Sequence, residues 1–479
     1  MRTLSIEAKT SIGKSITLMG WIDIRRDHGK LIFLELRDAA GKIQLVVTPK
    51  NAELHKIAET LRPEWVVEIT GEVAARPDAM KNPEHPTGEI ELKVTDILVL
   101  NESLTPPLDI SSGGLLIGEE VRMKYRYLDI RRPRLNKNLK NRFKALKFIR
   151  DFLSERGFTE VETPSLSKST PEGARDYLVP SRIEPGKFYA LPQSPQQYKQ
   201  LLMVGGLEKY FQIARCFRDE DTRGDRQPEF TQLDLEMSFV QAEDVIKLNE
   251  ELLINLIRAN YPEKTVQEIP FPRVSYKEAM EKYGTDRPDL RKNKEDQNLL
   301  AFCWVVDFPF FEKTEEGGFT FTHNPFSAPK AEFMPDLMNK KNIGEILTTQ
   351  YDVVLNGFEI GGGSIRNHKP DALKKVFEIM GFEEKKITEN FGHMLEALSY
   401  GAPPHGGIAW GFDRLMMLLE NEPNIREVIA FPKTGDARDL MMEAPSEVPK
   451  EQLKELRISV EKPREKIKNR PRLHRDGSN

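Results

Sequence analysis

Cysteine is almost absent from this sequence, and long apolar runs are absent altogether. The two cysteines, Cys216 and Cys303, lie far apart and show no CxxC or Cys/His spacing, so neither a disulfide framework nor a zinc site is indicated. No apolar run reaches the roughly 18 residues that could span a bilayer, and the N-terminal residues contain no signal-like apolar stretch. We therefore expect a cytoplasmic protein that neither enters nor crosses a membrane.

An excess of charge of either sign is also missing. Lys and Arg total 71 against 75 for Asp and Glu, which gives a formal net charge of -4. This balance gives no global sign of nucleic-acid binding, although basic residues gathered on one face would still allow it. The hydrophobic fraction of 39% and the charged fraction of 30% are those of an ordinary globular protein. A length of 479 residues predicts roughly two to four domains.

The N-terminal part of the chain, residues 1–104, predicts a small β-barrel. Five short β-rich segments are separated by turn residues, and this pattern suits an OB-fold. The predicted strands are Ile16–Ile24, Leu31–Leu36, Lys42–Thr48, Trp65–Val73 and Glu89–Leu100, with turns such as Asp27-His28-Gly29 between them. A small barrel without a role in RNA binding remains an alternative on this pattern alone.

Proline and glycine pairs predict a hinge over residues 105–135, before a second domain over 136–444. Within that domain, apolar residues at a spacing of three to four predict a helix from Leu139 to Arg156, which Gly157 would end. The apolar positions of this helix are Phe143, Leu146, Ile149, Phe152 and Leu153.

Residues 445–479 are highly charged and contain few apolar residues, so we expect a mobile extension. Its basic residues are Lys462, Arg464, Lys466, Lys468, Arg470 and Arg472. Two alternatives stay open for this extension, a solvated tail without a role and a tRNA-binding arm.

A predicted hairpin over residues 217–236 carries the strongest chemical signal. On its return strand Gln232, Asp234 and Glu236 alternate with leucines, so one face is polar and the other is apolar. An amphipathic surface strand would explain this alternation. Arg218 and Arg226 at the mouth of the hairpin favour a site, because guanidinium groups can bind phosphate through two hydrogen bonds.

Two other glycine-containing segments resemble nucleotide-binding motifs but do not match them. Gly13-Lys14-Ser15 lacks the earlier glycine of a P-loop and precedes a strand, so it predicts a turn. Gly361-Gly362-Gly363 is followed by Arg366 where a dinucleotide fingerprint requires glycine.

Several motifs resemble those of class II aminoacyl-tRNA synthetases. Phe217-Arg218-Asp219-Glu220 is similar to motif 2, the segment from Gly407 to Arg414 to motif 3, and the predicted helix with a strand from Thr159 to Pro164 to motif 1. The resemblance implies an α+β protein: an N-terminal OB-fold and a catalytic domain built on an antiparallel sheet flanked by helices. Motif 1 implies a homodimer.

Within this class, the chain resembles the bacterial aspartyl-tRNA synthetases. The resemblance rests on the segments Ser169–Tyr177, Gln193–Gln196 with Lys199, and Gly361–Arg366. It implies that the enzyme joins L-aspartate to ATP as aspartyl-adenylate and transfers the aspartyl group to tRNA(Asp).

The resemblance and the chemistry of aspartate together predict the substrate residues. A site that selects a side-chain carboxylate needs buried cations, which Lys199 and Arg366 can supply, and Asp234 is expected to orient the lysine. The resemblance places Glu172, Ser194 and Gln196 at the α-amino end and His323 near the substrate, while Asn324 stands where many relatives have a second histidine.

For ATP, the resemblance implies Arg218 at the α-phosphate, Arg414 at the far end of the triphosphate, and further contacts from Glu220, Gln227 and Glu359. Asp352 and Glu359 match the carboxylates that bind Mg²⁺ in the family. These two lie seven positions apart, which in one regular strand would place them on opposite faces, so we expect a bulge or bend at Gly357.

For tRNA, the resemblance places the anticodon on a barrel face that carries Phe33, Gln44 and Glu91, with Arg25 and Arg26 at phosphates. A core aromatic remains the alternative for Phe33. His28 and Ala79 stand where strict enzymes tend to have leucine and lysine, which favours a relaxed type that also charges tRNA(Asn). The alternative is that both are ordinary loop residues.

The large insertion that is usual in bacterial members is expected to be absent near residues 291–300. Two other functions stay open: an asparagine-tRNA ligase or a tRNA-independent amide-forming paralogue, and a non-catalytic RNA-binding protein on the same fold. Intact Arg218, Glu220, Asp352, Glu359 and Arg414 argue against loss of catalysis.

Overall fold

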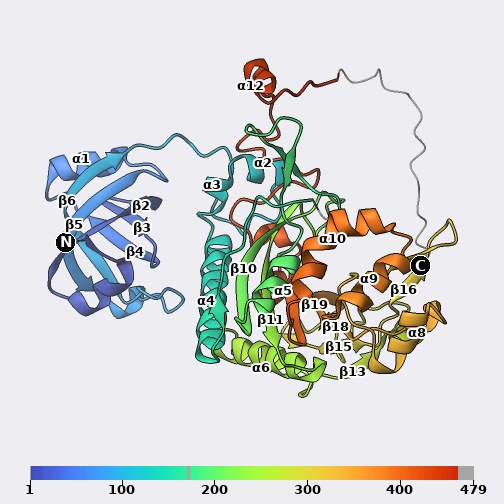
Figure 1. Cartoon of the computed structure of the whole chain (residues 1–479). Helices are drawn as coiled ribbons and strands as arrows, with labels where there is room; N and C mark the ends of the chain where they lie inside the picture. Colours follow the sequence, from blue (N-terminus) through green and yellow to red (C-terminus); the bar gives the residue numbers. More distant parts are fainter. Residues whose placement is uncertain (1, 170–172, 462–479) are drawn as a thin grey trace. The chain divides into compact units, whose positions relative to one another are not determined.

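The computed structural model describes residues 2–169 and 173–461 (Figure 1). The chain divides into two compact units, with the boundary between Ile117 and Gly118. Among the described residues, no helix is both long and apolar enough to cross a membrane.

The first unit is a β-barrel in which the five predicted strands are present. These are β2 (Ser15–His28), β3 (Leu31–Arg37), β4 (Lys42–Val47), β5 (Val66–Ala75) and β6 (Ile90–Asn101), with β1 (Arg2–Thr3) added parallel to β2. The sheet closes because β2 pairs with both β3 and β5, while β6 pairs with both β4 and β5. Helix α1 (Ala52–Thr60) connects β4 to β5.

One boundary in the barrel differs from the prediction. Strand β2 continues through Asp27 and His28, so the turn expected at these residues is reduced to Gly29 and Lys30. Gly29 has a φ of 63°, which glycine adopts without steric cost. The turn predicted at Gly13-Lys14-Ser15 is also present, because Gly13 lies in a turn that precedes β2.

The second unit is built on an eight-stranded sheet with the order β13-β15-β18-β19-β20-β11-β10-β7. Its strands are β7 (Thr159–Glu160), β10 (Lys209–Phe217), β11 (Glu229–Ser238), β13 (Arg273–Ser275), β15 (Phe302–Val306), β18 (Gln350–Leu355), β19 (Phe358–Ile365) and β20 (His405–Gly411). All neighbouring pairs are antiparallel except the outermost pair at each edge. The predicted fold class is therefore confirmed, although β7 is shorter than the strand expected from Thr159 to Pro164.

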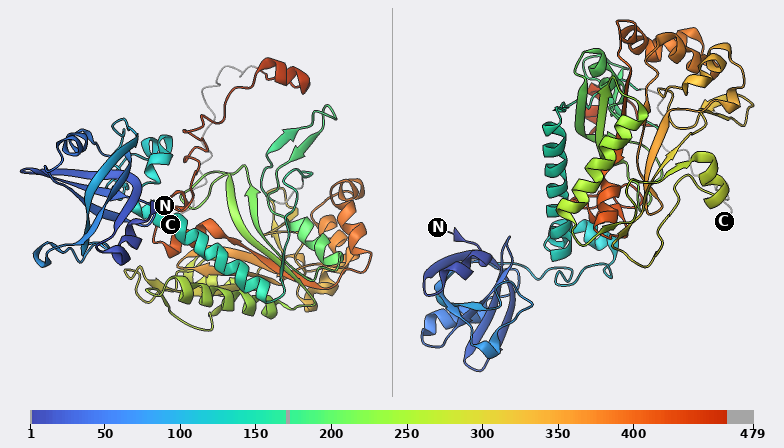
Figure 2. Two further views of the ribbon diagram at one scale, coloured as in Figure 1. Left: turned by 90° about the vertical axis from the view of Figure 1, so that its left-hand side faces the viewer. Right: turned by 90° about the horizontal axis from the view of Figure 1, so that it is seen from below.

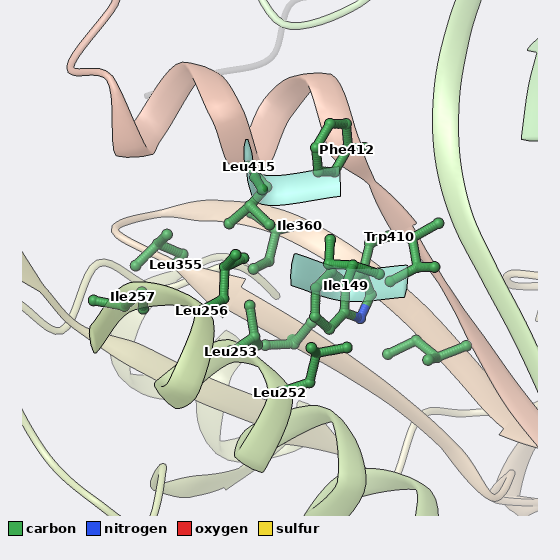
Figure 3. Packing of buried hydrophobic residues seen from close by; sticks show 14 of the residues in the cluster. Ile149, Leu252, Leu253, Leu256, Ile257, Leu355, Ile360, Trp410, Phe412 and Leu415 are labelled. Carbon is green, nitrogen blue, oxygen red and sulfur yellow. The ribbon is translucent and has the colours of Figure 1, made fainter. Parts of the chain in front are cut away.

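Three helices pack on one face of this sheet and form the main core. They are α4 (Pro133–Glu155), α6 (Ala242–Asn260) and α11 (Phe412–Leu419). Figure 3 shows Leu253 and Leu256 of α6 directed toward Ile360 and Trp410 of the sheet. Figure 2 shows α4 and α6 lying beside each other on this face.

Helix α4 is the helix predicted from Leu139 to Arg156, and it begins six residues earlier, at Pro133. Proline suits a first helical turn because its missing N–H has no partner there in any case. Gly157, with a φ of 78°, follows the helix as expected. Phe143, which we assigned to the apolar face, is 66% exposed, whereas Ala145, Ile149, Phe152 and Leu153 of the same helix are buried in the core.

The other face of the sheet is covered by α5 (Gln196–Val204), with α9 (Pro370–Ile379) and α10 (Glu384–Leu398) outside it. A second apolar cluster around Phe326, Phe377 and Phe391 joins these helices. Polar side chains of β11 therefore lie between the sheet and α5.

The remaining elements are shorter. They are η1 (Ser5–Ser11), η2 (Asp78–Met80), α2 (Glu119–Lys124), α3 (Arg126–Asp129), β8 (Leu178–Pro180), β9 (Phe188–Ala190), β12 (Thr265–Val266), α7 (Tyr276–Tyr283), β14 (Leu299–Leu300), β16 (Phe311–Lys313), β17 (Phe319–Phe321), η3 (Ala331–Phe333), α8 (Met334–Asn339), η4 (Ile343–Glu345), η5 (Ile425–Glu427) and α12 (Lys450–Glu455).

Three of these elements fall in segments that we expected to be irregular. Helices α2 and α3 occupy part of the predicted hinge, and Arg122 in α2 forms buried ion pairs with Asp129 and Glu427. Helix α12 lies in the charged C-terminal segment, where it buries no residue. The basic residues from Lys462 onward lie outside the described residues.

Candidate active site

Strand β11 forms the floor of a polar site at the centre of the sheet. It pairs with β10 on one side and with β20 on the other, so it is an internal strand with no free edge. Leu233 and Leu235 enter the core, whereas Gln232, Asp234 and Glu236 point to the opposite side and are at most 8% exposed. The alternative of an amphipathic surface strand is therefore wrong.

Two buried cations and two buried carboxylates form a network on this floor. Lys199 Nζ lies 2.8 Å from Asp234 Oδ2 and 3.3 Å from Glu236 Oε2. Arg366 binds Glu236 through two hydrogen bonds, Nε to Oε1 at 2.9 Å and Nη2 to Oε2 at 3.1 Å, and it donates to Ser364 Oγ. All four charged side chains are at most 1% exposed.

The charges in this network support one another. Burial alone would raise the pKa of Glu236, but Arg366 and Lys199 outweigh burial and hold it below the usual range. Burial likewise opposes the charged form of Arg366, and Glu236 keeps its pKa above the usual value. Asp234 Oδ1 is buried without a hydrogen-bond partner in the described part of the chain. Arg366 is thus kept in its charged form, burial raises the pKa of Asp234 in spite of Lys199, and the site retains an unused acceptor.

Lys199, Asp234 and Arg366 line a cavity of about 470 Å³, which we call the polar cavity. Ser194, Gln196 and Lys199 approach it from α5 and the residues before it, while His323 and Asn324 approach from the loop after β17. Ser194 Oγ accepts a hydrogen bond from the backbone N–H of Gln196 at 3.4 Å. Glu172, the other predicted ligand of the α-amino group, lies outside the described residues.

A second cavity adjoins the first and contains the predicted arginines. Arg218, Glu220, Gln232 and Glu359 line both, so the two spaces are continuous. We call the second one the arginine cavity. Its remaining lining residues include Asp225, Gln227, Phe230, Thr231, Ile360, Gly411, Arg414 and Ile425.

Neighbouring groups position the cations of the arginine cavity. Arg218 Nε donates to the carbonyl of Gln193 at 3.3 Å, and its guanidinium lies 5.1 Å from the centre of the Phe230 ring. Arg414 pairs with Asp225 at 3.1 Å and donates to the backbone carbonyl of Glu359.

Two other predicted residues of the arginine cavity have partners of their own. Glu220 pairs with Arg226 at 2.9 Å, and Gln227 Oε1 accepts from the backbone of Lys433. A polyanion with a flat apolar group would fit a space lined by these cations and an aromatic ring.

Asp352 and Glu359 lie on adjacent strands instead of on one strand. Gly357 belongs to the turn between β18 and β19, and the bulge in this hairpin lies at Val353 and Val354. Of the bulge or bend expected at Gly357, the chain therefore bends there, and this full reversal brings the two carboxylates together.

Gly362 supplies the space that these carboxylates occupy. A Cβ atom on Gly362 would lie 2.7 Å from Asp352 Oδ1 and 3.7 Å from Glu359 Oε1, so any larger residue would crowd them. Burial, with a further contribution from Glu359, raises the pKa of Asp352 well above its usual value. Two carboxylates this close without a cation between them are electrostatically unfavourable.

No cluster of three or more His, Cys, Asp or Glu side chains within the described ranges has an arrangement that could hold a metal. A cation between Asp352 and Glu359 would therefore take its other ligands from a substrate or from water, as Mg²⁺ does with nucleotides. His323 lies 3.7 Å from Asp352, and burial lowers its pKa.

In the barrel, the predicted anticodon residues Phe33, Gln44 and Glu91 lie on β3, β4 and β6, and Arg26 pairs with Phe33 in the sheet, whereas Arg25 pairs with the core residue Leu34. Phe33 alternates with the core residues Ile32 and Leu34, so the alternative of a core aromatic is wrong. Gln44 Nε2 donates to Glu91 Oε2 at 3.0 Å.

The two predicted phosphate-binding arginines of the barrel each have an acidic partner. Arg26 pairs with Glu35 at 2.8 Å, and Arg25 pairs with Asp27 at 2.7 Å. The hydrogen bond with Asp27 raises the pKa of Arg25 above its usual value. His28 at the end of β2 and Ala79 in η2 are both exposed.

Sequence reasoning gave no role to two residues of the site. Glu236 holds Lys199 and Arg366 together, and its alternation with Asp234 was the available signal. Phe230 lines the arginine cavity beside Arg218, yet a phenylalanine in a strand is usually a core residue.

Comparison with families places two known domains on this chain. Residues 118–435 match the family described as tRNA synthetases class II (D, K and N), and residues 16–100 match an OB-fold nucleic acid binding domain.

Two curated relatives span nearly the whole chain. The Aspartate--tRNA(Asp/Asn) ligase of Rubrobacter xylanophilus is 42% identical over 96% of this chain and 97% of its own length. The Aspartate--tRNA ligase of Bacillus licheniformis is 39% identical over 94% of this chain and 97% of its own.

Solved structures share the fold at lower identity. The asparaginyl-tRNA synthetase of Pyrococcus horikoshii, complexed with asparaginyl-adenylate, has a TM-score of 0.72 at 24% identity and covers 89% of this chain and 96% of its own. The aspartyl-tRNA synthetase of Entamoeba histolytica has a TM-score of 0.70 at 23% identity, covering 90% of this chain and 91% of its own.

Proposed function

The chain belongs to the class II tRNA synthetases (D, K and N), and we propose that it activates L-aspartate with ATP and transfers it to tRNA. It is thus an aminoacyl-tRNA ligase, an aspartate--tRNA ligase like its curated relatives. The observation that carries the choice of amino acid is the pair of buried cations, Lys199 and Arg366, in the polar cavity.

Lys199 and Arg366 would bind the side-chain carboxylate of aspartate. Each already has a carboxylate partner, so the network stays nearly neutral before substrate enters, and Glu236 keeps the pKa of Arg366 above its usual value. Asparagine would bring a neutral amide, whose N–H groups would face these donors unfavourably. The α-amino group would lie toward Ser194 and Gln196, which line the same cavity.

ATP would occupy the arginine cavity with its adenine against Phe230 and its phosphates between Arg218 and Arg414. An α-carboxylate oxygen of aspartate attacks the α-phosphorus, a bond to this oxygen forms, and the bond to the leaving pyrophosphate breaks. The cations hold the reactants in line and offset the negative charge of the phosphates, and these two effects account for most of catalysis in phosphoryl chemistry. A hydroxyl of the terminal ribose of tRNA then takes the aspartyl group and releases AMP.

Mg²⁺ fits the pair of Asp352 and Glu359, because two hard oxygen ligands converge over Gly362. When bound there, the ion would neutralise phosphate charge and orient the triphosphate.

The anticodon would lie on the barrel face with Phe33, whose half-buried ring offers a stacking surface for an unstacked base. Glu91 could accept from the amine of a cytosine, and its partner Gln44 would hold it in place. Exposed His28 and Ala79, together with relatives named for both tRNAs, support a relaxed enzyme that also charges tRNA(Asn).

Three further properties form part of the proposal. We expect a homodimer through the motif 1 region, where α4 exposes Phe143, and a cytoplasmic location. The Rubrobacter relative aligns over 584 positions, more than the 479 residues of this chain, so its sequence contains segments that are missing here. The short loop near residues 291–300 is the expected place of this difference.

Aspartate-dependent exchange of pyrophosphate into ATP tests the amino acid directly. We expect exchange with L-aspartate and at least about a hundredfold lower kcat/KM with L-asparagine, because one mispaired buried polar group costs several kcal/mol. Exchange with asparagine at a comparable rate would contradict the assignment. Exchange without any tRNA bound is expected, since both cavities lie within the second unit.

A further inference from the structure

A hydrogen-bonded chain of three side chains connects the polar cavity to a buried histidine. Gln196 Nε2 lies 3.0 Å from Gln200 Oε1, and Gln200 Nε2 lies 3.2 Å from His405 Nε2. His405 Nδ1 lies 2.7 Å from the carbonyl oxygen of Pro403. Gln200 and His405 are both fully buried, and only Gln196 reaches the cavity.

The backbone carbonyl of Pro403 sets the direction of every hydrogen bond in this chain. A carbonyl oxygen only accepts, so His405 must carry its proton on Nδ1, and the neutral ring then has a lone pair on Nε2. Gln200 must therefore turn its amino group to His405 and its carbonyl to Gln196. Gln196 must in turn donate its amino group to Gln200.

These hydrogen-bond directions leave the side-chain carbonyl oxygen of Gln196 to accept a hydrogen bond from the substrate. This oxygen has no hydrogen-bond partner among the described residues, and the side chain lines the polar cavity with Lys199, Asp234 and Arg366. An α-ammonium group needs acceptors, whereas an amide with the opposite orientation would present a donor to it.

We infer that His405 is a positioning residue for the amino acid: through Gln200 it holds the carbonyl oxygen of Gln196 toward the α-ammonium group of aspartate. This inference rests on the proposed function, because it takes the occupant of the polar cavity to be aspartate. It assigns a role to Gln200 and His405, which touch no substrate themselves.

The same series of hydrogen bonds makes the binding of aspartate sensitive to the charge of His405. A second proton on the ring would turn Nε2 into a donor, and Gln200 and Gln196 would both have to reverse, which would bring an N–H group against the ammonium.

Several groups around the ring decide when this proton is taken up. Burial lowers the pKa of His405. The nearby carboxylate of Glu236 and the hydrogen bond to Pro403 raise this pKa, whereas the electrostatic effects of Arg366 and His368 lower it further. The ring is therefore neutral at neutral pH and charges only as the pH falls.

Two variants of the full-length enzyme test the role of the lone pair. His405→Gln can offer a carbonyl oxygen to Gln200, whereas His405→Phe fills the space without any acceptor. In aspartate-dependent pyrophosphate exchange we expect His405→Phe to raise the KM for aspartate about tenfold or more and to leave the KM for ATP within about twofold. His405→Gln should stay within about threefold of the wild type in both.

A pH series separates positioning from plain structure. Between about pH 5 and 8, the aspartate KM of the wild type should rise as the pH falls, and the ratio of wild type to His405→Gln should follow the titration of the histidine. If His405→Phe does not fold, Gln200→Met replaces it, since it releases Gln196 and leaves the histidine in place; the same rise in aspartate KM is expected.

Equal loss in His405→Phe and His405→Gln, or an aspartate KM within about threefold in a folded His405→Phe or Gln200→Met, would overturn the inference. A wild-type enzyme that shows no exchange with aspartate would instead overturn the proposed function, so the two failures can be told apart.

Discussion

Replacement of Arg366 by methionine should separate what this arginine does for the fold from what it does for aspartate. Arg366→Met keeps an unbranched apolar stem but removes the guanidinium group and with it both hydrogen bonds to Glu236, at 2.9 and 3.1 Å. Loss of one partner of a buried ion pair costs roughly 3 to 5 kcal/mol of stability. Lys199, 3.3 Å from Glu236, remains as a second cation, so we expect the lower part of that range.

The pH dependence of stability follows from the pKa of Glu236. In the wild type this pKa is lowered, so the stabilisation is present above the pKa of the unfolded chain and is lost as the pH falls through the folded value. In Arg366→Met, burial should dominate and raise the pKa, so that the variant is most stable at low pH and loses stability as the pH rises. Thermal or urea unfolding at about pH 5 and 7.5 should therefore show a smaller deficit at the lower pH.

The double variant Glu236→Gln with Arg366→Met is the matched control, because it removes the unpaired carboxylate. It should be more stable than Arg366→Met and still fail to bind aspartate. In pyrophosphate exchange both variants should lose roughly 30- to 200-fold in kcat/KM for aspartate, with little change in the KM for ATP. An aspartate KM and kcat within about threefold of wild type in Arg366→Met would refute the assignment of the polar cavity.

Three other predictions concern separate parts of the molecule. Phe33→Ala should lower charging of tRNA about tenfold or more through lost stacking and leave pyrophosphate exchange unchanged, and a loss of exchange would mean that the barrel does more than bind tRNA. Arg414→Leu should raise the KM for ATP about tenfold while the KM for aspartate stays nearly constant; a change confined to aspartate would place ATP elsewhere. Removal of the residues after Pro445, including α12, should leave exchange intact and weaken tRNA binding in a salt-dependent way, whereas a folded but inactive truncated enzyme would show that this segment belongs to the catalytic unit.

Local patterns predicted the elements of the fold well, because each strand or helix follows from spacing within a few residues. The five barrel strands and helix α4 are present, and β11 alternates as expected. The errors concern residues whose burial depends on which other element packs against them. Phe143 fits the apolar spacing of α4, yet no neighbouring element covers it. The alternation on β11 suited a surface strand until its neighbours β10 and β20 were known.

The site shows the same limit. The family resemblance and the chemistry of aspartate together indicated Lys199 and Arg366, because a carboxylate substrate requires cations. Glu236 could not be assigned a role in the same way, since its function depends on two cations that lie 37 residues before it and 130 residues after it in the sequence. Likewise, spacing suggested a bulge or bend at Gly357 without deciding between them, and a turn between two paired strands is what joins Asp352 to Glu359.

Charging of the two tRNA transcripts with labelled amino acid tests the central claim most directly. The account predicts that aspartate is attached to tRNA(Asp), that tRNA(Asn) accepts aspartate with a kcat/KM within about tenfold, and that asparagine is attached to neither. Stable attachment of asparagine, or no aspartyl-tRNA with either transcript, would contradict the assignment of this chain as an aspartate ligase. A preference above about a hundredfold for tRNA(Asp) would contradict its relaxed specificity.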